Sequence, residues 1–197
     1  MLSGALAICA GAAFLFFGYS GGSEAANDLN PKRHYLNGQV EIGGRQYEFK
    51  YCRYAEPLVM LPGFRCAESL SKSPLHTLLS MNSWQNAEDY KTAAGAYLQP
   101  AQYLRDIDEW KEMVASGKMP KERWERESVL GEVIYREVTV VVARLVPKNK
   151  DAMVHVLGTC FVKRGDKYLH DGTAKERYRL LRELSADRYS IITGKKE

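Results

Sequence analysis

Polar and apolar residues alternate on both sides of Gly43–Gly44, which is the pattern of a β-hairpin. The alternating apolar residues are Val40 and Ile42 before the glycines and Tyr47, Phe49 and Tyr51 after them. Residues that recur with period two lie on one face of a strand. Two glycines suit the positive φ angles of a tight two-residue turn. The segment 39–51 is therefore predicted to form a hairpin, and Val59–Leu61 is a candidate for a further short strand.

The apolar spacing changes to three and four residues after Ser73–Pro74, which predicts helices. A serine before the first turn and a proline within it are typical of a helix start. The apolar residues that follow are Leu75, Leu78, Leu79 and Met81. A second helical segment is predicted from Asn86 to Leu98, where Pro100 interrupts it. A third is predicted from Tyr103 to Val114, where Gly117 ends it.

β-branched residues dominate the chain after the helical segments and predict strands. The predicted strands are Val129–Val146, Met153–Val162 and Tyr168–His170, with turns at 148–151 and 164–167 between them. Thr173 then begins a last helix with Tyr178, Leu181 and Leu184 on one side. Helices followed by an antiparallel meander predict an α+β fold class. The sheet is expected to be curved.

The first 23 residues carry no charged side chain. A mostly apolar run of this length can span a bilayer as a helix or act as the core of a secretory signal. A cleavage site is available at Ser23–Glu24–Ala25, although no Lys or Arg precedes the run and Lys32 and Arg33 follow it. Three alternatives stay open: a cleaved signal peptide, a retained membrane anchor over residues 2–19, and an N-terminal helix packed against partner chains.

The chain is accordingly divided into five parts. They are a signal peptide or membrane anchor (1–22), a linker (23–37), a β-hairpin extension (38–66), an α+β domain (67–172), and a charged C-terminal helix and tail (173–197). The 197 residues include 28 Lys and Arg against 24 Asp and Glu, a net charge of +4. This mild charge, without a long basic run, does not indicate a nucleic-acid partner. The basic residues of the last part alternate with acids, which favours a solvated helix face over a site for anionic lipid.

Three cysteines lie beyond the apolar start. Cys52 and Cys66 are candidates for a disulfide that would close a short loop and contribute roughly 3 kcal/mol in an oxidising compartment. Cys160 lies in an apolar strand and is interpreted as a buried thiol. The cysteine and histidine spacings match no metal motif, and no phosphate-binding loop or dinucleotide fingerprint occurs. No metal or cofactor is therefore expected.

Residues 70–172 resemble the nuclear transport factor 2-like superfamily. The resemblance lies in Ser73–Pro74 opening a helix, in Asn86–Tyr90, in Tyr97 at a helix end, and in the hairpin Val162–Leu169 after valine-rich strands. It implies a cone-shaped sheet around helices with a pocket at the open end. In that superfamily the pocket is catalytic in some members and binds ligands in others, and one branch forms periplasmic scaffolds of type IV secretion machines. The hairpin before the first helix and the helix after the last strand depart from the pattern.

The candidate ligand-pocket residues are His155, Thr159, Tyr97, Trp110 and Arg136. His155 and Thr159 share a strand face, although a histidine satisfied within the sheet explains the same pattern. Most of the helical Trp and Tyr residues are interpreted as core, and the remainder as lining of a cavity. Arg136 flanks an apolar strand centre.

No catalytic residue is assigned. The helix acids Asp106, Asp108 and Glu109 point away from an apolar stripe and are expected in solvent. The pair His170–Asp171 is interpreted as a turn rather than a catalytic dyad.

The function indicated is that of an exported or membrane-tethered, non-catalytic binding or assembly module with protein partners or self-association. Its location is expected to be periplasmic or otherwise extracytoplasmic, and residues 2–19 contact the membrane if they are retained. One alternative is a small-molecule-binding enzyme of the isomerase or cyclase kind. The other is an accessory subunit of a large membrane complex.

Overall fold

The computed structural model describes residues 31–66, 73–119, 124–149 and 152–194. The apolar start, predicted to be a signal or an anchor, lies outside these residues. Within the described ranges, no helix is both long enough and apolar enough to cross a membrane.

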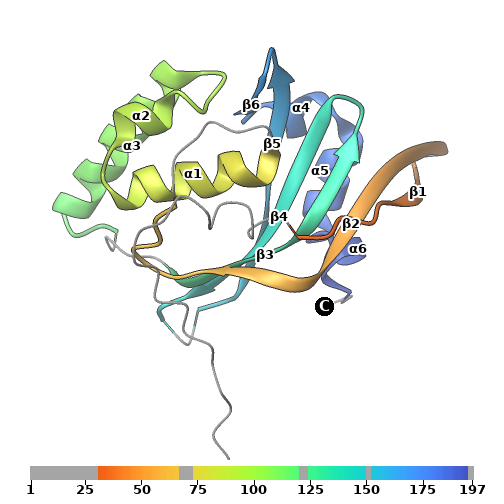
Figure 1. Cartoon of the computed structure of the whole chain (residues 1–197), viewed down its shortest axis with the longest axis horizontal. Coiled ribbons are helices and arrows are strands. Elements are labelled where there is room, and N and C mark those ends of the chain that lie inside the picture. Colours follow the sequence, from red (N-terminus) through yellow and green to blue (C-terminus); the bar gives the residue numbers. More distant parts are fainter. Residues whose placement is uncertain (1–30, 67–72, 120–123, 150–151, 195–197) are drawn as a thin grey trace, which may run out of the picture.

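Six antiparallel strands form one open sheet whose order in space is their order in the chain (Figure 1). They are β1 (Leu36–Ile42), β2 (Arg45–Met60), β3 (Trp124–Tyr135), β4 (Val138–Pro147), β5 (His155–Arg164) and β6 (Lys167–His170). The predicted hairpin is confirmed, since β1 pairs with β2 and Gly43 and Gly44 both have positive φ. The α+β class is confirmed as well.

Two groups of helices cover opposite faces of the sheet (Figure 1). The first group, α1 (Pro74–Asn86), α2 (Tyr90–Ala94) and α3 (Pro100–Ala115), lies in the connection between β2 and β3. The second group, α4 (Ala174–Arg177), α5 (Arg179–Ala186) and α6 (Ser190–Thr193), follows β6. The sheet is thus the middle of three layers, and each of its faces has its own apolar core.

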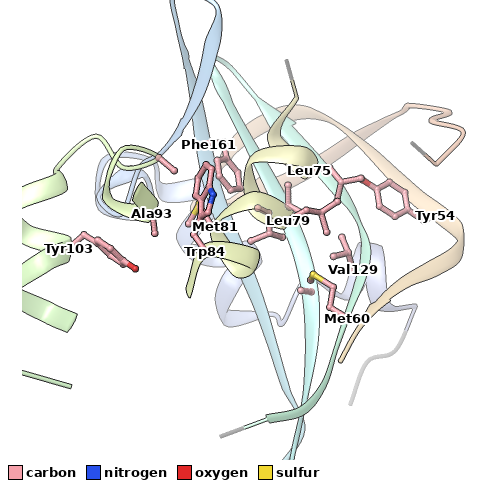
Figure 2. Close-up of a cluster of buried hydrophobic side chains, with 14 of the residues drawn as sticks. Tyr54, Met60, Leu75, Leu79, Met81, Trp84, Ala93, Tyr103, Val129 and Phe161 are labelled. Carbon is pink, nitrogen blue, oxygen red and sulfur yellow. The ribbon is translucent and has the colours of Figure 1, made fainter. Parts of the chain in front are cut away.

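Helix α1 begins where the sequence predicts. The hydroxyl of Ser73 accepts a hydrogen bond from the backbone N–H of His76 at 3.3 Å, and Pro74 occupies the first turn. Nine side chains of this helix are buried, including Leu75, Leu79 and Trp84. Figure 2 shows these side chains gathered with Val129 and Phe161 of the sheet.

Strand β4 is buried on both faces. Val138, Val140 and Val142 pack into the core beneath α5, whereas Val141 and Ala143 pack into the core beneath α1. A strand covered on both faces has a continuous run of apolar residues in its sequence, whereas a strand with one exposed face alternates apolar and polar residues. This explains why the sequence 138–143 is apolar at nearly every position.

The prediction of one long strand over Val129–Val146 is wrong, because a tight turn at Arg136–Glu137 divides it into β3 and β4. Arg136 adopts a positive φ of 55°, a conformation for which glycine or asparagine is the usual signal. Its guanidinium lies 5.5 Å from the ring centres of both Tyr135 and Tyr178. The sequence contains no glycine or asparagine that would predict this turn. The structure instead shows contacts of the turn with a residue far away in the chain.

The second predicted helix is shorter than expected. Asp89 caps α2 by accepting a hydrogen bond from the N–H of Thr92 at 3.1 Å, and only Tyr90–Ala94 is helical. Pro100 opens α3 instead of interrupting a helix, since its ring is compatible with the first turn. The last helix is likewise divided into three short helices, with a left-handed residue, Tyr189, before α6.

A buried carboxylate binds the segment before β1 to the sheet. Glu132 of β3 is 1% exposed and accepts hydrogen bonds from Tyr35 at 2.5 Å and Tyr54 at 2.7 Å. Arg33 completes the group with an ion pair at 3.2 Å. Burial, together with the Glu132 carboxylate, raises the pKa of both phenols, which keeps them protonated as donors. Residues 33–35, assigned to a linker by sequence, therefore belong to the folded domain.

We predict that Glu132→Ala destabilises the domain by about 3 kcal/mol, because removing one member of a buried ion pair leaves the other groups without their partner. Urea unfolding followed by circular dichroism measures the loss. Glu125→Ala, at an exposed position on the same strand, is the control. Equal effects of the two substitutions would contradict the structural role of Glu132.

A second prediction concerns Gly158 on β5, where Tyr189 lies directly against the backbone. A Cβ atom at this glycine would lie 2.1 Å from the Tyr189 hydroxyl oxygen, and that tyrosine is fully buried. Gly158→Ala is expected to lower the free energy of unfolding by about 1–3 kcal/mol through overpacking. Gly172→Ala is the control, since its Cβ would meet no atom closer than 3.8 Å. A Gly158→Ala protein as stable as the control would show that Tyr189 can move at no cost.

Candidate functional site

A cavity of about 1000 Å³ lies on the face of the sheet that α1 covers. Its walls come from the end of β2 and the loop after it, from α1 and α3, and from β3, β4, β5 and β6. Ligand sites in proteins usually occupy roughly 300–1000 Å³ and are mainly apolar with a few polar groups. This cavity is at the upper end of that range.

The cavity exists because α3 does not pack closely on the sheet. Helix α1 lies against the strands, whereas α3 packs against α2 and extends away from β5 (Figure 1). The rings of Tyr97 and Tyr103 stack at 4.0 Å, and Tyr90 meets Trp110 edge-to-face at 6.5 Å. These ring contacts support α3 at a distance from the strands, so its apolar side chains line a space instead of filling a core.

Glu127 of β3 is the most distinctive polar group of the cavity wall. Within the described part of the chain, its one hydrogen-bond donor is the amide of Asn82 on α1, at 3.2 Å. Burial raises the pKa of the Glu127 carboxyl to about 7, and the Asn82 bond offsets the rise only in part. The group can therefore exchange a proton near neutral pH.

The cavity wall carries more carboxyl groups than cations. The carboxyl groups are Glu88, Asp106, Glu109 and Glu127, and the basic groups are Arg126 and His170. Burial lowers the pKa of His170 to about 4, so its ring is neutral at pH 7. Its Nδ1 is buried without a hydrogen-bond partner among the described residues. Five aromatic side chains also line the cavity: Phe64, Tyr90, Tyr97, Trp110 and Trp124.

Three of the five candidate pocket residues lie together in this wall: Tyr97, Trp110 and Thr159. The other two lie elsewhere. His155 is exposed, with its ring edge-to-face with Trp124 at 5.4 Å, so it touches a wall residue from outside. Arg136 lies at the β3–β4 turn against Tyr178, on the side of the sheet that α4–α6 cover. Contact of any of the five with a ligand stays a prediction.

Glu127, Asn82 and His170 are wall residues that the sequence analysis did not select. Glu127 shares a strand face with Val129, and an acid on an apolar strand face is a signal that alternation could have revealed. Asp106 and Glu109 are exposed, as expected, yet they also border the cavity.

Asp171 does not form a dyad with His170. Its carboxylate accepts hydrogen bonds from Thr173 and Arg177, while His170 ends β6 and lines the cavity.

The cysteines and the acidic groups are the remaining side chains that could bind a metal. Cys52 and Cys160 are free thiols in the structure, and a Cys52–Cys66 disulfide stays a prediction. Over the described residues, no three His, Cys, Asp or Glu side chains are grouped so that they can hold a metal ion.

Comparisons of the chain with protein-family models, with curated proteins and with solved structures found no match. The resemblance to the nuclear transport factor 2-like superfamily therefore stays a prediction from the sequence, and the cavity itself carries the functional argument.

We predict that Glu127 makes the domain less stable as the pH rises. Its folded-state pKa of about 7 lies above the ordinary value of 4.5, so the folded state binds the proton more tightly. The contribution is full below pH 4.5 and is lost as the pH rises through 7, by about 3 kcal/mol in total.

Urea unfolding of the wild type and of Glu127→Gln at pH 5 and pH 8 measures this contribution. The low pKa of His170 gives a slope of the opposite sign below pH 6.5, but it is common to both proteins and cancels in their difference. Glu125→Gln, at an exposed site, is the control. If the free energy of unfolding changed with pH in the same way in the wild type and in Glu127→Gln, the raised pKa of Glu127 would be refuted.

Proposed function

We propose that this protein is a non-catalytic binding module that holds a largely apolar small molecule between α1, α3 and the sheet. The observation that carries the proposal is the cavity of about 1000 Å³ with aromatic and methionine side chains in its wall. A ligand in this space would supply the packing contacts that side chains supply elsewhere in protein interiors.

The composition of the wall supports a ligand with a large apolar body. The side chains of Met60, Met81 and Met113 contribute flexible apolar surface, which adapts to irregular shapes. Trp110 and Trp124 add flat surfaces of the kind that bind rings or chains. The wall also carries polar groups, of which Glu127 with Asn82 forms the best-defined anchor.

The place of action is part of the same proposal. The apolar residues 2–19 support an exported or membrane-tethered protein, in a periplasmic or similar compartment, since such a run is typical of signals and anchors. The cone-shaped fold of the nuclear transport factor 2-like superfamily would place a pocket at the open end of a sheet that curls around helices, which is compatible with a cavity between α1, α3 and the sheet.

An acid–base enzyme is the second candidate, and Glu127 favours it. A carboxyl with a pKa near 7 is suited to donate or accept a proton at neutral pH, as an isomerase or cyclase requires. Conversion of a bound compound by the wild type, abolished in Glu127→Gln with binding retained, would replace the binding module by the enzyme. Recovery of the compound unchanged supports the binding module.

Assembly with other proteins stays a proposal, and exposed apolar side chains support it. Val59 is 48% exposed, Leu61 55% and Leu157 46%, and the last two also border the cavity. Native mass spectrometry of the protein from its own membrane or exported fraction distinguishes a monomer with a retained small molecule from an oligomer or an accessory subunit of a membrane complex.

We predict that N-phenyl-1-naphthylamine, an uncharged fluorescent probe of apolar sites, binds in this cavity with increased emission. Trp110→Ala is expected to weaken binding about fivefold or more, since an aromatic contact contributes on the order of 1 kcal/mol. Fluorescence titration measures the affinity.

Leu104→Ala is the matched control, because Leu104 lies on the same helix, is exposed and is not part of the wall. Absence of probe binding to the wild type, or equal binding by Trp110→Ala, would count against the cavity as the binding site.

A further inference from the structure

We propose that the cavity selects organic cations, namely small molecules with an aromatic or aliphatic body and a positively charged amine or ammonium head that pairs with Glu127. This inference rests on the proposed function, since it names the chemical class of ligand that the cavity binds. Three observations carry it: the charge of the wall, the aromatic side chains, and the lack of a protein cation at Glu127.

The charge of the wall disfavours anions. Four carboxyl groups border the cavity, against Arg126 and a His170 ring that is neutral at pH 7. The Arg126 side chain is exposed, and no ion pair joins it to Glu127 in the described part of the structure. Glu88, Asp106 and Glu109 are exposed, so water screens their repulsion of a ligand carboxylate or phosphate, whereas the half-buried Glu127 repels such a group more strongly.

The aromatic side chains suit a cationic head. The face of a tryptophan or tyrosine ring carries negative charge density and attracts ammonium groups within roughly 6 Å. The Tyr90 ring already attracts a cation of the chain, because Lys111 Nζ lies 4.6 Å from its centre. Trp110 and Trp124 line the cavity, and among the described residues neither has a cation–π contact. Each ring also meets another ring, Trp110 that of Tyr90 and Trp124 that of His155.

Glu127 supplies the specific partner. The Glu127 side chain is half-buried, and a carboxylate partly removed from water is stabilised by a cationic partner, yet within the described residues only the neutral amide of Asn82 bonds to it. A ligand ammonium group in its place would donate charge-assisted hydrogen bonds, which are about twice as strong as neutral ones. The same pairing would hold the Glu127 carboxyl in its ionised form. An alcohol of equal size would donate only an ordinary hydrogen bond.

Three naphthalene compounds that differ in their head groups test the inference on the full domain: 2-(1-naphthyl)ethylamine as the cation, 2-(1-naphthyl)ethanol as the neutral analogue, and 1-naphthylacetate as the anion. Calorimetric titration at pH 7.5 measures each affinity. The cation is expected to bind about tenfold more tightly than the alcohol, and the anion more weakly than both.

Glu127→Gln removes the charge and keeps the shape of the side chain. It is expected to lower the affinity for the amine about tenfold and to leave the affinity for the alcohol within about twofold. Glu125→Gln on the same strand is the control and should change neither affinity. Because the preference among the three compounds is measured on the wild type, the inference stays testable even if Glu127→Gln folds poorly.

Each outcome separates the inference from the proposed function. Binding of all three compounds with equal affinity, or a preference for the anion, overturns the cation inference and leaves the binding module intact. A preference for the amine that Glu127→Gln does not reduce overturns the role of Glu127. Failure of all three compounds and of N-phenyl-1-naphthylamine overturns the binding module itself.

Discussion

The structure depends on the burial of β4 on both faces. Val140 and Val142 belong to one apolar core and Val141 to the other, so helices must cover each side of the sheet at this strand. Helix α1 supplies one cover and α5 the other. An uncovered face here would expose a row of valines to water, at about 25 cal/mol for each Å² of apolar surface. The three-layer arrangement follows from this requirement.

The cavity is a consequence of how that cover is made. On this face α1 lies closely on the strands, and α3 is supported by aromatic contacts with α2 and the segment after it, among them the stacked Tyr97 and Tyr103. The sheet beneath α3 therefore borders a space in which one acid, Glu127, is half-buried with a single amide partner among the described residues. The packing of α3 creates the space, and Glu127 gives its wall a polar group that can bind a ligand.

Local chemistry explains which features could be predicted from sequence. The glycine pair at 43–44 and Ser73–Pro74 each specify a turn or a helix start through their own backbone preferences, and both predictions hold. The turn at Arg136 has no such residue and depends on tyrosines from two elements.

Long-range contacts explain what was missed. Glu132 binds Arg33, which is 99 residues away in the chain, so the local sequence around either residue does not predict the ion pair. Tyr97 and Trp110 reach the cavity wall from the helical segments and Thr159 from β5, whereas the turn at 136–137 places Arg136 away from the cavity.

The most direct test of the central claim, that the space between α1, α3 and the sheet is a ligand site, is to locate a bound probe by NMR. The methyl groups of Met60, Met81, Met113 and Met119 line the cavity, whereas Met153 is exposed and lies outside it. With ¹³C-methyl methionine labelling, nuclear Overhauser effects from N-phenyl-1-naphthylamine to the four wall methyls, and none to Met153, are predicted. Contacts confined to Met153, or no contact with any wall methyl, would contradict the account.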